Sequence, residues 1–269
     1  MPKHRRGTTT APAAALAAAL LLAAGATGAA ARGEGLEELN NLDINIPNTL
    51  DDAFAAERGS VTVLGAARYD NRRGHDNAVR LFPRLLVGVA EGLQATVQVP
   101  YTVGFGPGDD HGVVSFGALY NFNRETAWLP AFAVSVEGGP AVGPGAHGGE
   151  LRLFGIASKT IDPQAFRRLH LNVAWFRRFD PGEEERRDRH RVALGYSQLL
   201  TTRTVLVANY LRETLEERGE RAANILEAGV RYQVSPGVVL GGALGAGVGR
   251  DSPRFRAIAS VQFALSRGE

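Results

Sequence analysis

The chain has 269 residues, of which 44% are apolar and 22% are charged, and it contains 33 Gly and no Cys. This length suggests one large domain or two ordinary ones. The lack of Cys excludes a disulfide framework, thiolate metal sites and cysteine nucleophiles. Lys and Arg outnumber Asp and Glu by 30 to 28, so the whole chain has a formal net charge of +2.

The N-terminus has the features of a secretory signal peptide. Lys3, Arg5 and Arg6 are basic, residues 13–24 are all Ala or Leu, and small residues follow. This is the order of charge, apolar stretch and small-residue cleavage site that a signal peptide has. The apolar stretch is too short for the roughly 20 residues of a membrane-spanning helix, which argues against an uncleaved anchor. We therefore expect residues 1–31 to be a signal peptide that is removed.

Removal of this leader changes the charge of the protein. It deletes three basic residues and no acidic one, so 27 basic and 28 acidic residues remain, a net charge of −1. The positive charge of the whole chain therefore belongs to the leader, and we expect no nucleic-acid partner.

After the leader, apolar and polar residues alternate with a period of two. In residues 93–101 the odd positions are Leu, Ala, Val, Val and Tyr, and the even positions are Gln, Thr, Gln and Pro. A strand projects successive side chains to opposite faces, so this segment has one apolar and one polar face. Segments of this kind are predicted at 60–69, 78–90, 92–101, 112–122, 128–138, 150–160, 167–178, 189–200, 203–213, 222–234, 237–247 and 254–265.

The connections between these segments alternate in length. Glu91, Thr201-Thr202 and Ser235-Pro236 are short, whereas longer polar or Gly-rich stretches such as 179–188 lie between them. Short turns on one side and longer loops on the other, after a signal peptide, are typical of an outer-membrane barrel. Lipid offers no hydrogen-bond partners to a sheet edge, so a spanning sheet must close. The sequence predicts an all-β fold, a closed antiparallel transmembrane β-barrel of about 12 strands over residues 59–269, in the bacterial outer membrane.

A soluble secreted all-β protein is the alternative, because its half-buried strands alternate too. The large charged side chains on the polar faces argue against it, since a packed soluble core could hardly hold them. We therefore expect outer-membrane lipid around the barrel. We also expect the barrel-assembly machinery as a partner, with Phe263 as the aromatic residue near the C-terminus that it recognises.

Several short strings occur in order along residues 45–265. They include Ile46-Pro47, Asp51–Ala53, Leu93–Tyr101, Gly117–Asn123, Glu125–Ala131, Ala157–Thr160, Glu227–Tyr232 and Asp251–Arg256. In these strings the chain resembles the outer-membrane barrel family named for the meta-cleavage pathway of phenol degradation, whose members are described as transporters. The resemblance implies passage of small aromatic or other hydrophobic compounds, and it brings no catalytic residues.

If the apolar faces meet lipid, the opposite residues line the lumen, and many of these are charged. A charge on the lipid face near mid-bilayer costs about 2–4 kcal/mol, which favours this assignment. The charges form either an ion-pair network that stiffens the barrel or a basic path that attracts carboxylates and aromatic rings. About twelve strands leave a narrow or partly plugged passage. The predicted lumen-lining residues are Arg68, Arg80, Arg84, Glu137, Arg152, Arg168, His170, Glu227, Arg231 and Arg256.

Residues 32–58 precede the first predicted strand. Thr49 as N-cap and Asp52 at the third position predict one helical turn over 49–54. This N-terminal segment is either a plug of the lumen or a disordered periplasmic lead-in, because terminal segments often lack order.

The sequence gives little support to an enzyme. An outer-membrane phospholipase needs a His and a Ser two positions apart on a strand, and no His-X-Ser occurs. Asp109-Asp110-His111 has the residue types of an outer-membrane protease but lacks a second acidic cluster placed clearly opposite. The His residues lack metal-ligand spacing, so we expect no metal and no cofactor.

Three functional hypotheses follow. The first is a channel for passive passage of small organic compounds, with a preference for aromatic or anionic ones. The second is a closed structural or surface-exposed barrel without transport activity. The third is an outer-membrane hydrolase.

Overall fold

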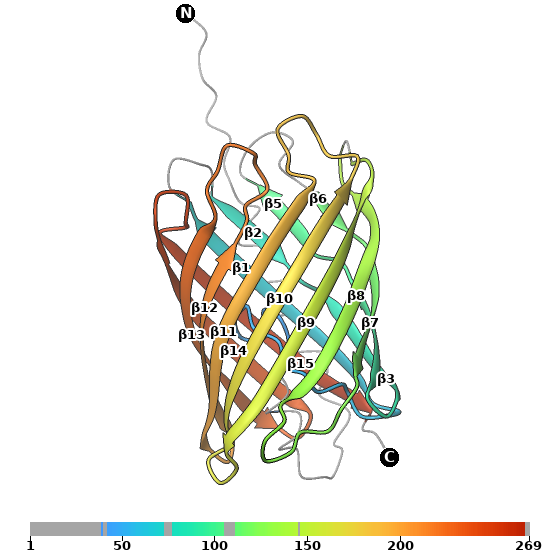
Figure 1. Ribbon diagram of the computed structural model, residues 1–269, viewed down its shortest axis with the longest axis vertical. Coiled ribbons are helices and arrows are strands. Elements are labelled where there is room, and N and C mark those ends of the chain that lie inside the picture. The colour runs from blue at the N-terminus through green and yellow to red at the C-terminus, as the bar shows by residue number, and fades with distance from the viewer. Residues whose placement is uncertain (1–38, 40–41, 73–76, 105–110, 145, 267–269) are drawn as a thin grey trace, which may run out of the picture. The chain divides into compact units, whose positions relative to one another are not determined.

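The computed structural model describes Leu39 and residues 42–72, 77–104, 111–144 and 146–266. The predicted signal peptide, residues 1–31, lies outside the described residues. In the described part of the chain, no helix is long and apolar enough to cross a membrane. The described residues form one antiparallel sheet of fifteen strands (Figure 1): β1 (Val61–Asn71), β2 (Ala78–Leu81), β3 (Arg84–Ala90), β4 (Leu93–Gln98), β5 (Tyr101–Gly104), β6 (His111–Val113), β7 (Ser115–Asn121), β8 (Ala131–Val142), β9 (Gly149–Asp162), β10 (Arg167–Phe179), β11 (Asp188–Thr201), β12 (Thr204–Glu213), β13 (Ala223–Ser235), β14 (Val238–Val248) and β15 (Phe255–Ser266).

The sheet closes on itself. β15 pairs with β1 along its length, from Val61 opposite Ser266 to Asn71 opposite Phe255. Both β2 and β3 pair with β1, and both β6 and β7 pair with β8, so each of these two pairs is one strand with a break. β4 pairs with β3 and β5 pairs with β2, so β4 and β5 are likewise one strand with a break. The fifteen strands in the described residues therefore make twelve spanning strands. The predicted closed antiparallel barrel of about 12 strands is confirmed.

Proline explains the three breaks. Pro83 separates β2 from β3, and Pro100 separates β4 from β5. A proline ring has no N–H to donate to a ladder. Pro140 of β8 lies opposite the third break, at Val114. The neighbouring strands stay aligned because single hydrogen bonds remain: the N–H of Val99 donates to the Pro83 carbonyl at 3.0 Å, and that of Val114 to the Pro140 carbonyl at 3.1 Å.

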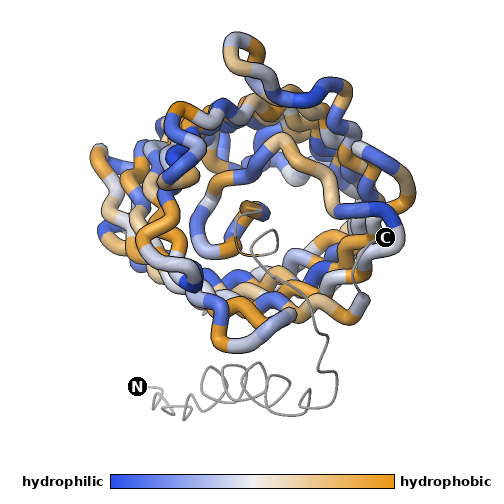
Figure 2. Tube along the Cα trace, turned by 90° about the horizontal axis from the view of Figure 1, so that it is seen from below, coloured by the Kyte–Doolittle hydropathy of each residue, from blue (hydrophilic) through white to orange (hydrophobic). Residues whose placement is uncertain are grey.

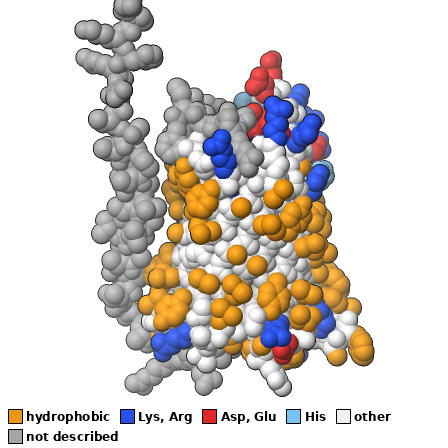
Figure 3. All heavy atoms as spheres, turned by 90° about the vertical axis from the view of Figure 1, so that its left-hand side faces the viewer, with side chains coloured by type: hydrophobic (Ala, Val, Ile, Leu, Met, Phe, Trp, Pro, Cys, Tyr) orange, Lys and Arg blue, Asp and Glu red, His pale blue; other side chains and the backbone are white. Residues whose placement is uncertain are grey.

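The apolar side of the strands faces outward. On β13, Leu226 is 55% exposed, whereas its neighbour Glu227 is 3% exposed and Arg231 is completely buried. On the face that Figure 3 shows, charged side chains gather toward the two rims, and hydrophobic side chains without charged ones cover much of the wall between them. A soluble protein places these residue types the other way round. The arrangement is that of a barrel surrounded by lipid.

Most connections differ in length between the two ends of the barrel, as the sequence predicts, but the connection 122–130 is long and lies beside the short turn 91–92. The turns at 91–92, 202–203 and 236–237 lie at one end, which we call the short-turn end, and β1 begins there. Loops 180–187 and 214–222 lie at the opposite, long-loop end.

The fifth predicted strand differs from its prediction. The segment predicted at 128–138 begins at Ala131 and continues to Val142 as β8. Asn123 closes the preceding turn, because its Nδ2 donates to the Pro130 carbonyl and its Oδ1 accepts the Phe132 N–H, both at 2.8 Å. Trp128 lies in this turn, 95% exposed, rather than in a strand.

Residues 42–58, which we call the inner segment, run inside the barrel (Figure 2). Its apolar side chains join three clusters on the inner wall: Leu50 packs against β11 to β14, Ala53 against β7 to β10, and Ile46 against β1 and β3. Gly195 of β11 makes room for this contact, because a Cβ there would lie 2.3 Å from Leu50 Cδ2. The inner segment therefore contacts the wall in three sectors of the bore.

Candidate functional site in the barrel interior

A buried carboxylate of β13 holds one side of the inner segment. Glu227 accepts the backbone N–H of Thr49 at 2.8 Å and its hydroxyl at 3.1 Å. Asn48 Nδ2 donates to Asn209 Oδ1 at 2.5 Å, and Asn209 Nδ2 donates to Glu227 at 3.2 Å. The predicted helical turn over 49–54 is not formed, because Glu227 binds the Thr49 donors and fixes the segment to the wall.

Side chains of β9 and β10 hold the next part of the inner segment, which follows Thr49 in the chain. Asn172 Nδ2 donates to the Asp51 carbonyl at 2.9 Å, and its Oδ1 accepts the Asp51 N–H at 2.7 Å. Ser158 Oγ accepts the N–H of Ala53 at 3.0 Å. Buried backbone groups need such partners, so the polar residues on the inner wall replace the water that the segment has lost.

His170 and Arg168 lie next to this contact. The ring of His170 lies between the hydroxyls of Ser158 and Ser197, 3.0 Å from each. The Arg168 guanidinium lies 4.7 Å from the centre of the Phe54 ring. His170 and both serines are less than 5% exposed, so these groups support the inner segment and have no access for a substrate of the hydrolase hypothesis.

Arg256 of β15 is the centre of an ion-pair network. Its guanidinium contacts Asp70 at 2.6 Å, Glu227 at 2.8 Å and Glu213 at 3.2 Å. Arg68 pairs with Asp70 at 3.1 Å. Buried charges require such partners. Since Glu227 also binds the inner segment, the network joins that segment to the wall.

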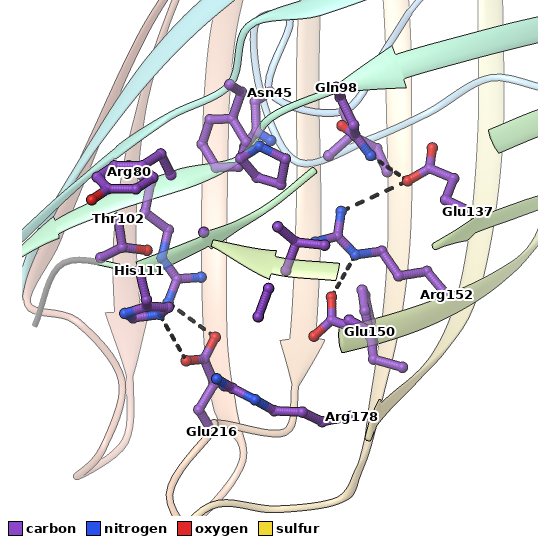
Figure 4. Close-up of a pocket in the computed structure, with 18 of the residues that line it drawn as sticks. Asn45, Arg80, Gln98, Thr102, His111, Glu137, Glu150, Arg152, Arg178 and Glu216 are labelled. Carbon is purple, nitrogen blue, oxygen red and sulfur yellow. Dashed lines mark hydrogen bonds and ion pairs between the residues drawn. The ribbon is translucent and has the colours of Figure 1, made fainter. Parts of the chain in front are cut away.

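A cavity of about 110 Å³ lies between the inner segment and the long-loop end (Figure 4). Asn45 lines it on the side of the inner segment. On one wall Arg152 lies between two carboxylates, 2.5 Å from Glu150 and 3.7 Å from Glu137. This wall therefore presents fixed, paired charges to the cavity.

Aromatic rings line the same cavity. The Arg68 guanidinium lies 5.5 Å from the centre of the Phe82 ring. Arg189 and Arg191 lie 5.4 and 4.9 Å from the centre of the Phe176 ring. Guanidinium groups are attracted to ring faces at such distances. The cavity thus combines cationic groups with apolar surface.

Glu216, from the loop between β12 and β13, also reaches the cavity (Figure 4). Its Oε1 accepts from Arg80 at 3.1 Å and from Arg189 at 2.9 Å, and its Oε2 lies 3.6 Å from His111 Nε2. Burial by itself would raise the pKa of Glu216, but the cationic groups of Arg80 and Arg189 hold it well below its usual range. Glu216 is therefore a carboxylate at neutral pH.

The structure places the predicted lumen residues in three groups. Those that line the cavity are Arg68, Arg80, Arg84, Glu137 and Arg152. Those in the network around Arg256 are Arg256 itself and Glu227. Those elsewhere on the inner wall are Arg168, His170 and Arg231, the last of which donates to Gln262 at 2.7 Å.

Sequence reasoning missed several residues of the cavity. Arg189 and Arg191 follow the period of two in the predicted strand 189–200, so parity could have assigned them to the lumen. Glu216 lies in a loop, where no periodicity shows which side chain turns inward. His111 belongs to the protease-like string Asp109-Asp110-His111 in the sequence, but in the structure it contacts Glu216.

The charges around the cavity are largely balanced. Among the described residues, seven Arg side chains and three carboxylates line it. Four of the Arg also pair with carboxylates outside the lining: Arg68 with Asp70, Arg84 with Asp43, Arg178 with Glu185, and Arg191 with Glu213. The cavity surface is rich in Arg, and carboxylates outside the lining balance part of this positive charge.

No family model and no curated protein match the chain. Solved structures do. The COG4313 outer membrane channel from Pseudomonas putida F1 superposes with a TM-score of 0.62 at 12% identity, over 80% of this chain and 98% of that chain. The NanC porin gives a TM-score of 0.54 at 12% identity, over 76% and 100% of the two chains. The KdgM porin gives 0.52 at 9% identity, over 76% and 99%. The chain therefore has the fold of outer-membrane channels and porins.

Proposed function

We propose that this protein is a channel of the bacterial outer membrane through which small organic solutes pass passively. The likeness in fold to an outer-membrane channel and to porins supports this proposal. The ordered strings along residues 45–265 support its membership of the family named for the meta-cleavage pathway of phenol degradation.

The observation that carries the proposal is the cavity at the long-loop end. Fixed Arg side chains and three Phe rings, those of Phe82, Phe154 and Phe176, line it, and these favour anionic or aromatic solutes by charge attraction and ring contact. A barrel that served only as a rigid scaffold would fill this space with side chains, as small barrels do.

The inner segment is, in this proposal, a plug that limits the bore. It contacts three sectors of the wall, and its polar contacts with Glu227 and Asn172 hold it in place. Such contacts can be released one at a time, unlike a covalent block. The plug would set the size of solutes that pass.

Reconstitution tests the channel. The mature chain and a variant lacking residues 33–56 are inserted into planar bilayers and into liposomes. We expect a small conductance from the intact chain, and a larger conductance with faster liposome swelling from the variant. A closed structural barrel predicts neither in either protein, and that result would reject the channel.

Selectivity is tested with a pair of solutes of opposite charge, benzoate and benzylammonium. Arg84→Ala removes a cationic group from the cavity lining and should lower the permeability ratio of benzoate to benzylammonium. Arg212→Ala is the matched control, because Arg212 is an exposed side chain of β12 outside the lining. An equal ratio in all three proteins would contradict the proposed anion preference.

A further inference from the structure

The loop that carries Glu216 crosses the mouth of the barrel. Counted in chain order around the barrel, loop 214–222 joins the ninth and tenth of the twelve spanning strands in the described residues. Arg80 lies on the second spanning strand and His111 on the fourth. The fourth and tenth strands of a twelve-stranded barrel are opposite each other. Glu216 therefore contacts strands across the barrel from its own loop through Arg80 and His111, and it also contacts Arg189 on the eighth strand, beside that loop.

The neighbouring loop 180–187 supports this position. The N–H of Arg186 donates to the Glu216 carbonyl at 2.7 Å, and the N–H of Arg218 donates to the Glu184 carbonyl at 2.9 Å. Glu185 and Glu217 form an antiparallel bridge. The backbone at Glu216 is thus held by another loop, while its side chain extends to the opposite wall.

The groups that surround the Glu216 carboxylate belong to the wall. Arg80 is on β2, Arg189 on β11 and His111 on β6, and all three line the cavity. Two guanidinium groups around one carboxylate are the arrangement by which proteins bind carboxylates. The strands hold these donors, whereas the carboxylate is contributed by a loop and can be withdrawn with it.

We propose that Arg80, Arg189 and His111 form a binding site for the carboxylate of a small organic acid, and that Glu216 occupies this site as an intramolecular ligand. The incoming acid replaces Glu216 and releases the loop from the opposite wall. This inference rests on the proposed function, since it names the solute class that the cavity receives.

The ring contacts of the cavity specify the rest of the ligand. Phe176 is 7% exposed, packs against the guanidinium groups of Arg189 and Arg191, and lines the cavity together with Phe82. A cavity of about 110 Å³ is of the order of one small ring, since an apolar cavity of about 150 Å³ accepts benzene. Withdrawal of Glu216 adds space beside the donors. The ligand class is therefore an aromatic monocarboxylate.

Binding of benzoate to the folded, detergent-solubilised mature chain tests the site, with benzamide as the neutral probe of the same shape. If Glu216 occupies the donors about nine-tenths of the time, Glu216→Gln should bind benzoate about tenfold more tightly than the unaltered chain. Benzamide should bind equally to both. Glu217→Gln is the matched control, because Glu217 carries the same charge in the same loop and is exposed. The double change Arg189→Gln with Glu216→Gln should abolish the gain.

A second measurement uses the unaltered chain, so that the test does not depend on a variant. Saturating benzoate should speed hydrogen exchange of the amides in loop 214–222, because Glu216 is displaced, and benzamide should not. Equal benzoate affinity in the unaltered chain and Glu216→Gln, or unchanged exchange of the loop, would overturn the site. Conductance of the same proteins separates this failure from failure of the channel: a conducting barrel with no gain in affinity rejects only the site. A barrel that gains affinity but passes no ion or solute rejects only the channel.

Discussion

Leu50→Ala tests whether the inner segment is a separately docked element. Leu50 is completely buried and packs against wall residues of β11 to β14, among them Ala193 and Val207. Truncating a buried Leu to Ala costs about 2–5 kcal/mol, because apolar contacts are lost and a cavity remains. Leu50 belongs to the segment and not to the sheet. The cost should therefore fall on docking of the segment rather than on closure of the barrel.

The magnitude can be followed by hydrogen exchange. A loss of about 3 kcal/mol raises the undocked population about a hundredfold, since each 1.4 kcal/mol is a factor of ten. Exchange of the amides in residues 42–56 reports that population, because the N–H groups of Thr49 and Ala53 donate to wall side chains only when the segment is docked. We expect about a hundredfold faster exchange there, with the barrel strands unchanged.

Leu240→Ala is the matched control for this experiment. Leu240 lies on the outer face of β14 and is 45% exposed, so the same truncation leaves the docking contacts intact. Exchange in residues 42–56 should not change in this variant. If Leu50→Ala accelerated exchange equally in the segment and in the strands, the segment and the barrel would open together, and the reasoning that treats it as a plug would be refuted.

Two further predictions concern single carboxylates. Glu227→Gln should weaken docking of the inner segment by about 1.5–3 kcal/mol, because it changes a charged acceptor of both Thr49 donors. Thr49→Val removes only the hydroxyl donor and should cost about 1 kcal/mol. Hydrogen exchange of residues 42–56 in the two variants and in their combination measures both costs. Glu216 should hold its loop across the mouth at neutral pH and release it in acid. Its pKa lies well below the ordinary 4.5, so its stabilising contribution is complete above pH 4.5 and is lost as the pH falls toward the lower value. Exchange of loop 214–222, corrected for intrinsic rates, should accelerate in that acid range, and Glu216→Gln should lack the transition.

The sheet and its two faces could be predicted because the same free-energy difference, between a side chain that faces lipid and one that faces the lumen, acts at every strand position. Arg231 lies between Val230 and Tyr232, and the strand puts it on the opposite face from both. Lipid penalises an outward Arg by about 2–4 kcal/mol, so parity determines its side. The same choice, repeated in every segment, predicts closure and the inner positions of Arg168 and Glu227. No tertiary information is needed for that step.

The docking of the inner segment could not be predicted in this way. Thr49 and Glu227 are 178 residues apart in the chain, and their contact has no local pattern. The capping pattern at Thr49 and Asp52 predicted a helical turn, but a buried carboxylate on the wall competes for the Thr49 donors and wins. A short capped turn gains about 1 kcal/mol from its cap, whereas hydrogen bonds to a buried charge contribute about 1.5–3 kcal/mol each.

The two sequence-based interpretations of the lumen charges, a stiffening network and a basic path, are compatible in this cavity. A row of uncompensated Arg would hold an organic anion too tightly for passage, because conduction needs binding weak enough to allow release. Carboxylates behind the lining, such as Asp70 and Glu213, reduce that attraction while leaving the guanidinium groups at the surface. Glu216 acts at the cavity surface itself, because it competes with an incoming anion for Arg80 and Arg189. Neutralising the rear carboxylates should therefore lengthen the residence of an anion, whereas neutralising Glu216 should raise its occupancy and free the loop.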